Sequence, residues 1–213
     1  MISKYKSLKE ECLESNMKLN ELGLVLYTFG NVSAVDRNNA VFAIKPSGVP
    51  YEKLTASDIV VVDFDNVVVE GKLKPSSDTK THSLLYKQWK EIGGISHSHA
   101  KFSCAWAQSL MDIPIFGTTH ADHLTTDIPC TSPMKDELIK GNYEHNTAIQ
   151  ILETFEEKKI SYKEVEMVLV GNHGSFTWGL DAQESVYNNR VLEEIAELAF
   201  MTLNLNPNAM RLK

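Results

Sequence analysis

Two histidines separated by one residue, His97 and His99, form the most informative pattern in this sequence. The segment Ile95 to His99 is predicted to be a strand, in which residues i and i+2 point to the same face. Both imidazoles can therefore reach one metal ion. A third histidine, His173, lies between two further predicted strands, and Asp78 lies at the start of a predicted helix.

Three imidazoles and one carboxylate suit a catalytic zinc ion that keeps one coordination position open to substrate. Mn²⁺, Fe²⁺ and Co²⁺ accept the same ligands, so the donors indicate a metal more strongly than they identify it. The spacing alone is equally compatible with surface or hydrogen-bonded histidines. Gly93 and Gly94 favour the metal interpretation, because glycines permit a close approach of the backbone.

Three short segments have the composition of an anion-binding site, with small residues, backbone N–H donors and, in one segment, a lysine. The last of them directly precedes a predicted helix, where free N–H groups bind phosphate. Each segment taken singly is also typical of an ordinary turn. The segments are Gly30-Asn31-Val32-Ser33, Lys45-Pro46-Ser47-Gly48 and Pro75-Ser76-Ser77-Asp78.

Two further carboxylates are candidates for proton transfer. Asp122 lies in the polar segment Thr118 to His123 and can act as a general acid or base if it lies near the metal. The alternative is a turn or helix-capping role. Glu144 precedes a predicted helix, and there we expect it to serve as a favourable charge at the helix start.

Predicted helices and strands alternate along the chain and carry these residues. The Asp65-Asn66 pair between two β-branched runs predicts a hairpin, and Asp181 with Glu184 has the spacing of a capping box. The alternation, together with the hairpin signals, predicts an antiparallel or mixed sheet with helices packed on it. Strands are predicted at 41–45, 59–64, 67–69, 95–99, 168–170 and 175–178, and helices at 5–19, 79–92, 101–109, 146–158 and 181–206.

The composition limits the classes of function. A chain of 213 residues is expected to form one domain, and its net charge of −7 argues against non-specific nucleic-acid binding, which needs a basic surface. Three widely spaced cysteines give no disulfide framework. No apolar run is long enough to span a bilayer, and no signal-peptide pattern opens the chain. We therefore expect a cytoplasmic protein without nucleic-acid or membrane partners.

Taken together, the motifs resemble those of the L-ribulose-5-phosphate 4-epimerase family, within the class II aldolase and epimerase superfamily. The resemblance extends from about Asn16 to about Pro207. It implies an α/β fold with a central, mainly antiparallel sheet between helical layers, as a single domain over residues 1–213. The segments that carry it are 30–37, 45–49, 75–79, 93–99, 117–122, 128–131 and 173–179.

The resemblance also implies a role for each matching residue. The related aldolases carry a glutamate where this chain has Asp78, so the Ser76-Ser77-Asp78 run favours the epimerases. Asp122 is implied to be the acid–base residue. The implied metal ligands are Asp78, His97, His99 and His173, and the implied substrate and phosphate contacts are Gly30, Asn31, Lys45, Ser47, Gly48, Ser76 and Ser77.

The implied activity is the interconversion of L-ribulose 5-phosphate and D-xylulose 5-phosphate. It proceeds by metal-dependent retro-aldol cleavage of the bond between C3 and C4, followed by its re-formation with inverted C4. The implied cofactor is one Zn²⁺ per subunit, with Mn²⁺ or Co²⁺ as substitutes. The implied assembly is a homotetramer with active sites at subunit interfaces, serving L-arabinose or L-ascorbate breakdown.

Two features depart from the family pattern. The family carries a tyrosine in a short C-terminal tail as the second proton-transfer group, and the last tyrosine here is Tyr187. We expect that tail to lie beyond the residues given. His123 and Leu124 also stand where the family has aromatic residues. Two alternatives therefore stay open: a class II sugar-phosphate aldolase, and a tail-less homologue that keeps only the fold.

Overall fold

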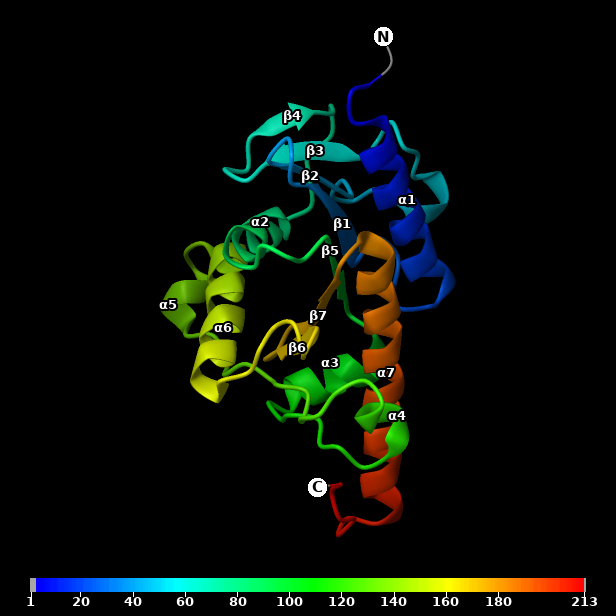
Figure 1. The fold of residues 1–213 in the computed structure, drawn as a ribbon, viewed down its shortest axis with the longest axis vertical. Coiled ribbons are helices and arrows are strands. Elements are labelled where there is room, and N and C mark those ends of the chain that lie inside the picture. The colour runs from blue at the N-terminus through cyan, green and yellow to red at the C-terminus, as the bar shows by residue number, and fades with distance from the viewer. Residues whose placement is uncertain (1–2, 213) are drawn as a thin grey trace.

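A seven-stranded sheet forms the centre of the computed structural model, which describes residues 3–212 (Figure 1). The strand order is β4-β3-β2-β1-β5-β7-β6, and every neighbouring pair is antiparallel, so the mixed-sheet alternative is excluded. The strands are β1 (Asn31–Asp36), β2 (Val41–Ile44), β3 (Val60–Asp63), β4 (Val68–Glu70), β5 (Gly94–Ser98), β6 (Met167–Val170) and β7 (Gly174–Gly179).

Helices cover both faces of this sheet. Figure 1 shows α1 (Lys6–Glu21) and α7 (Ala182–Leu205) on one side, and α2 (Thr79–Gln88) and α6 (Tyr143–Lys158) on the other. Helix α3 (Lys101–Gln108) packs along α7. The structure therefore has the layers that the sequence predicts. The short helices are η1 (Tyr51–Lys53), α4 (Thr118–Ala121) and α5 (Asp136–Ile139).

Alternation along the strands divides the core into two parts. Phe42 on β2, with Val60 and Val62 on β3, belongs to the apolar cluster beneath α2 and α6. Their neighbours Ala43 and Val61 belong to the cluster beneath α1. Successive side chains of a strand point to opposite faces, so these strands must be covered on both sides.

Helix α2 is shorter than the sequence predicts. It ends at Gln88, whereas the glycines at 93 and 94 predict a later end. Trp89 leaves the helix in an extended conformation and is buried, with its ring centroid 4.9 Å from Tyr162 and 4.6 Å from Trp178. Tertiary packing of one indole therefore ends the helix before the glycines are reached.

Gly93 and Gly94 allow a close backbone approach, but not the approach to a metal site that the sequence predicts. A Cβ on Gly93 would lie 1.8 Å from the carbonyl oxygen of Leu180, and one on Gly94 would lie 2.3 Å from Cα of Ala182. The close backbone approach is real, but it is an approach to the start of α7 and not to His97 or His99.

Other elements match the sequence with small shifts. The Asp65-Asn66 hairpin forms between β3 and β4, with Asn66 at a φ of +67°. The Asp181 side chain caps α7 by accepting a hydrogen bond from the Glu184 backbone N–H over 2.7 Å. Helix α6 begins three residues earlier than predicted, at Tyr143, and β1 is a strand that the sequence motifs did not mark.

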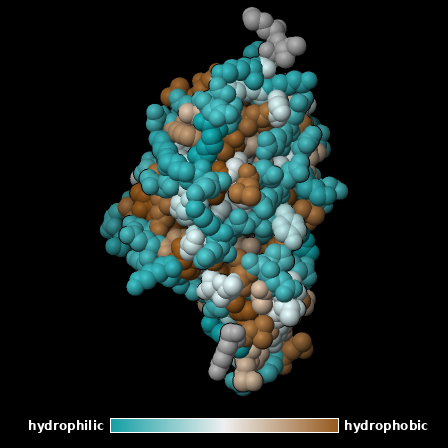
Figure 2. Space-filling model, in the orientation of Figure 1, coloured by the Kyte–Doolittle hydropathy of each residue, from teal (hydrophilic) through white to brown (hydrophobic). Residues whose placement is uncertain are grey.

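No helix within residues 3–212 is long and apolar enough to cross a membrane. Polar side chains cover most of the face seen in Figure 2, with apolar side chains interspersed among them.

Candidate active site

One cavity of about 330 Å³ gathers all the residues that the sequence predicts as metal ligands or substrate contacts. They come from segments far apart in the chain and meet where β5 ends and where β1 and β7 begin. The lining residues are Thr28, Phe29, Gly30, Asn31, Lys45, Pro46, Ser47, Gly48, Ser76, Ser77, Asp78, His97, His99, Tyr143, Glu144 and His173.

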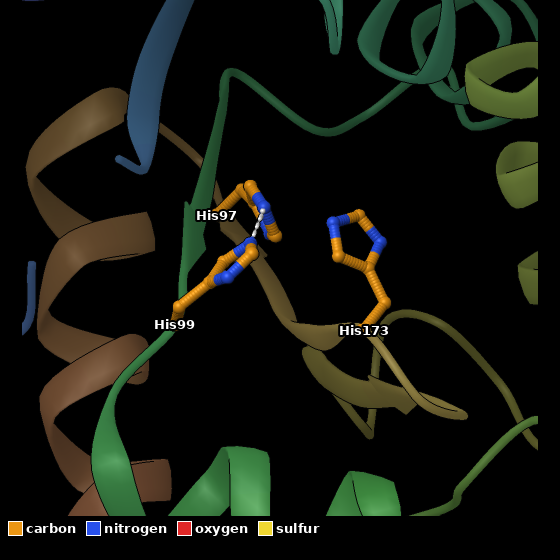
Figure 3. A group of neighbouring side chains, drawn as sticks. All are labelled: His97, His99 and His173. Atoms are coloured by element: carbon orange, nitrogen blue, oxygen red, sulfur yellow. Dashed lines mark hydrogen bonds between the residues drawn. The ribbon is translucent and has the colours of Figure 1, made fainter. Parts of the chain in front are cut away.

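Three histidines converge at this cavity, as Figure 3 shows. His97 is on β5 and His99 directly follows that strand, while His173 lies in the turn between β6 and β7. That turn is set by Asn172, which has a φ of +62°. One ring nitrogen from each histidine lies within 4.8 Å of the others, so the three can hold one metal ion.

The hydrogen bonds of His97 show which ring nitrogen faces the cavity. Its Nδ1 lies 2.8 Å from the Ser175 carbonyl oxygen, which only accepts, so Nδ1 carries the proton. Nε2 then presents a lone pair at 3.0 Å from Nε2 of His99. The ring is also stacked on Phe176, with centroids 4.2 Å apart. A fixed tautomer of this kind is typical of a metal-ligating imidazole.

Burial keeps these rings neutral. Burial and the neighbouring His99 lower the pKa of His97 to about 3, and burial followed by the proximity of His97 lowers the pKa of His173. Metal binding requires a neutral imidazole. In addition, Nδ1 of His173 is buried without a hydrogen-bond partner within the described chain. The donors present therefore fit a divalent metal.

Asp78 lies beside the histidines, although it does not cap the helix that it precedes. Its Oδ2 accepts a hydrogen bond from Asn31 Nδ2 over 2.7 Å and lies 3.9 Å from Nε2 of His97. No hydrogen bond runs from its side chain to the first turn of α2. The carboxylate is thus turned toward the cavity, at the edge of the three-histidine group.

Two of the three predicted anion-binding segments are joined side by side. Ser47 N donates to the Lys74 carbonyl over 2.9 Å, and Ser76 N donates to the Lys45 carbonyl over 3.0 Å. Pro46 and Pro75 form an isolated bridge between these hydrogen bonds. The two loops therefore form one wall of the cavity, with the N-terminus of α2 beside it.

Lys45 brings a buried positive charge to this wall. Its side chain is 1% exposed, and its Nζ donates to the Thr28 carbonyl over 3.2 Å and lies 4.6 Å above the Tyr51 ring. No carboxylate within residues 3–212 forms a salt bridge with it. Burial lowers the pKa of Lys45 to about 8. A buried cation without a counter-ion favours an anionic ligand.

The backbone conformation and the close packing at position 30 require a glycine. It has a φ of +75°, and a Cβ there would lie 2.6 Å from Cγ1 of Val25 and 2.9 Å from the His97 carbonyl oxygen. Tyr51 holds the same turn by donating its hydroxyl proton toward the carbonyls of Phe29 and Gly30. The turn therefore brings the backbone directly against the ligand strand.

Asp122 does not line the cavity within a single chain. It follows the short helix α4 and is exposed. By contrast, Glu144 lines the cavity, although the sequence predicts only a helix-start role for it. Tyr143, Thr28 and Phe29 also line it and carried no sequence motif that pointed to the site. Tyr143 and Glu144 are the first two residues of α6, which packs against α2.

Comparisons with known proteins agree with this arrangement. The family model described as class II aldolase and adducin N-terminal domain matches residues 10–200. Proteins named L-ribulose-5-phosphate 4-epimerase UlaF, from Salmonella paratyphi B and Salmonella typhi, are 46% identical over 200 residues, covering 94% of this chain and 87% of theirs.

Solved structures show the same fold. An L-fuculose 1-phosphate aldolase superposes with a TM-score of 0.82 at 25% identity, covering 100% of this chain and 92% of that protein. An L-fuculose-1-phosphate aldolase from Thermus thermophilus superposes with a TM-score of 0.71 at 20% identity, covering 96% and 98% of the two chains.

Proposed function

Because this chain belongs to the class II aldolase family, we propose that it is a metal-dependent L-ribulose-5-phosphate 4-epimerase. The family and fold predicted from the motifs are both confirmed. One observation carries the proposed activity: a single cavity holds the three-histidine group, Asp78 and the buried Lys45, which forms no salt bridge within residues 3–212.

The family is metal-dependent, and the three histidines can hold the ion. We assign the ligands as His97, His99 and His173, with Asp78 as a further ligand, and the resident metal as one Zn²⁺ per subunit. A divalent ion bound there supplies Lewis-acid polarisation of substrate oxygens next to the C3–C4 bond. The chain's contribution is a preset geometry, since Ser175 fixes the His97 ring and Asn31 fixes the Asp78 carboxylate.

We assign the binding of the substrate phosphate to the cavity wall that the two joined loops form. Lys45 provides the charge, and the joined loops provide the hydroxyl groups of Ser47, Ser76 and Ser77 and the backbone N–H groups of Gly48 and Ser77. The backbone N–H groups of Ser47 and Ser76 join the two loops to each other. Retro-aldol cleavage releases an aldehyde, which must rotate and present its other face before the carbon–carbon bond re-forms. A firm hold on the phosphate keeps that fragment in place until the bond re-forms.

Cleavage also needs a group that takes the proton from the C4 hydroxyl, and we assign this role to Asp122. Since Asp122 does not line the cavity of its own chain, a second copy must bring it there. The exposed apolar residues of the neighbouring segment support such a contact, because Phe29, which lines the cavity, is 53% exposed, and Leu26 and Tyr27, which precede it in the chain, are 58% and 80% exposed. We therefore propose a homotetramer whose sites form between neighbouring subunits.

Product analysis on L-ribulose 5-phosphate tests this proposal. An epimerase forms D-xylulose 5-phosphate without accumulating free fragments. Free glycolaldehyde phosphate and dihydroxyacetone without epimer would identify the enzyme as an aldolase instead. Absence of turnover with metal bound would contradict the proposed substrate, and absence of bound metal would favour a homologue that keeps only the fold.

A further inference from the structure

Two of the histidines lie just outside the strands that carry them. Ser98 and Ser175 form the last residue pair of the β5–β7 ladder. His99 follows Ser98 directly, and His173 precedes the first residue of β7. The backbone ladder therefore does not extend to these two imidazoles, and their separation depends on what holds the strand ends.

A buried polar cluster holds those ends from the other side of the sheet. The side chains of Ser98 and Ser175 alternate with that of His97, so they point to the face covered by α7. There Ser98 Oγ donates to Asn189 Oδ1 over 2.8 Å and lies 3.0 Å from Ser175 Oγ. Since Ser98 uses its proton on Asn189, the proton between the two serines comes from Ser175.

This cluster is directly connected to the ligand set. The backbone carbonyl of Ser175 accepts the hydrogen bond from Nδ1 of His97, while its side chain joins the cluster. Ser98, Ser175 and Asn189 are all fully buried. Burial removes competition from water and strengthens the hydrogen bonds of the cluster.

One helical turn further along α7, Glu193 holds the chain on the other side of His99. Its two carboxylate oxygens accept hydrogen bonds from the backbone N–H groups of Phe102 and Ser103, over 2.8 and 2.9 Å. These are free donors at the start of α3, where the N-cap position is occupied by Ala100, which has no hydrogen-bonding side chain. Helix α7 thus fixes the chain before and after His99.

We propose that Asn189, supported by Glu193, is a positioning residue for the metal centre. It holds the Ser98 hydroxyl at the end of β5, and Ser98 in turn contacts Ser175 at the start of β7, so that the anchored pair sets the separation between the imidazoles of His99 and His173. It touches neither substrate nor metal. This inference rests on the metal centre of the proposed function, because its effect is exerted through the ligands.

Co²⁺ binding to the Asn189→Leu variant tests the role. Leucine has a similar size but cannot accept the Ser98 hydrogen bond. We expect the Kd for Co²⁺ to rise about 10- to 100-fold, as for other residues that orient metal ligands, and the visible absorption bands of bound Co²⁺ to shift. Ser98→Ala should change both in the same direction and serves as the test if Asn189→Leu does not fold.

The matched control is Asn188→Leu, on the same helix. Asn188 is also buried, but its Nδ2 donates to the Trp178 carbonyl and to Glu166, away from the ligands. This variant should unfold at a lower temperature yet bind Co²⁺ with wild-type affinity and spectrum. Wild-type Co²⁺ affinity in folded Asn189→Leu, or equal losses in both variants, would overturn the positioning role. Failure of the wild-type protein to bind Co²⁺ would instead overturn the metal centre itself.

Discussion

Asn31 donates a hydrogen bond to Asp78 across 2.7 Å, joining the first residue of β1 to the residue before α2. The bond turns the carboxylate toward the three histidines rather than toward the helix that it precedes. It also explains why Asp78 forms no helix cap, although aspartate is a favoured capping residue.

Asn31→Leu should therefore weaken metal binding, because the Asp78 carboxylate loses the donor that orients it. We expect about a 10- to 100-fold rise in the Kd for Zn²⁺, measured by competition with a chromophoric chelator. Asn39→Leu is the control, since Asn39 makes a bond of the same length to Asp36 at an exposed site. Equal affinity of the two variants for Zn²⁺ would show that the Asp78 carboxylate does not need the hydrogen bond from Asn31.

The activity should fall at alkaline pH because Lys45 loses its charge there. Burial lowers its pKa to about 8, so the cation is present below that pH and is lost as the pH rises through it. We expect kcat/KM for the sugar phosphate to fall above about pH 8. Lys45→Met should lower kcat/KM about 10- to 100-fold, the loss of one or two charge-assisted hydrogen bonds, and should remove this step.

The exposed neighbour Lys74 supplies the control for that profile. Lys74→Met should keep both the rate and the alkaline step. A wild-type kcat/KM that stays constant from pH 7 to pH 10 would mean that Lys45 does not provide the charge for the phosphate.

Gly30→Ala should reduce both stability and activity. Its φ of +75° strains any other residue, and the added Cβ would meet Val25 and the His97 carbonyl. We expect a loss of about 1–3 kcal/mol in the free energy of unfolding, measured with urea. Gly23→Ala has a similar φ of +69° with open space around the Cβ, so it should lose stability alone. Full activity of the Gly30→Ala variant would show that catalysis does not depend on the close approach of the Gly30 backbone to His97.

The assignment of Asp122 to a neighbour's site can be tested by mixing subunits. Asp122→Asn and His97→Ala should each abolish most of the activity. Co-refolded at equal amounts, they should regain about a quarter of the wild-type rate, because random pairing across an interface leaves that share of sites intact. No recovery in verified mixed tetramers would place Asp122 outside the partner's site.

The sequence predicts the layers of the fold, and its histidine spacing picks out three residues that the structure brings together at one cavity. The Asp65-Asn66 turn and the Asp181 cap are set by a few adjacent residues, and both form as expected. The early end of α2 could not be predicted, since it depends on Trp89 packing against Tyr162 and Trp178, far along the chain.

In the cavity, too, some residues were marked by local sequence signals, whereas others are placed by packing between distant segments. The histidine spacing and the small-residue segments are visible in the sequence, and each of them contributes residues to the cavity lining. Glu144 was expected to serve only its helix, because its place in the cavity depends on how α6 packs against α2. Asn189 carries no motif at all, and only its hydrogen bond with Ser98 in the folded chain connects it to the strand that carries His97.

The most direct test of the proposed activity is conversion of L-ribulose 5-phosphate in D₂O, with and without a chelator of divalent metals. Carbon–carbon cleavage leaves the single C–H bond at C4 intact, so the account predicts D-xylulose 5-phosphate without deuterium at C4. The chelator should abolish its formation, and Zn²⁺ should restore it. Deuterium at C4, or epimer formed at the full rate with the metal removed, would contradict the account.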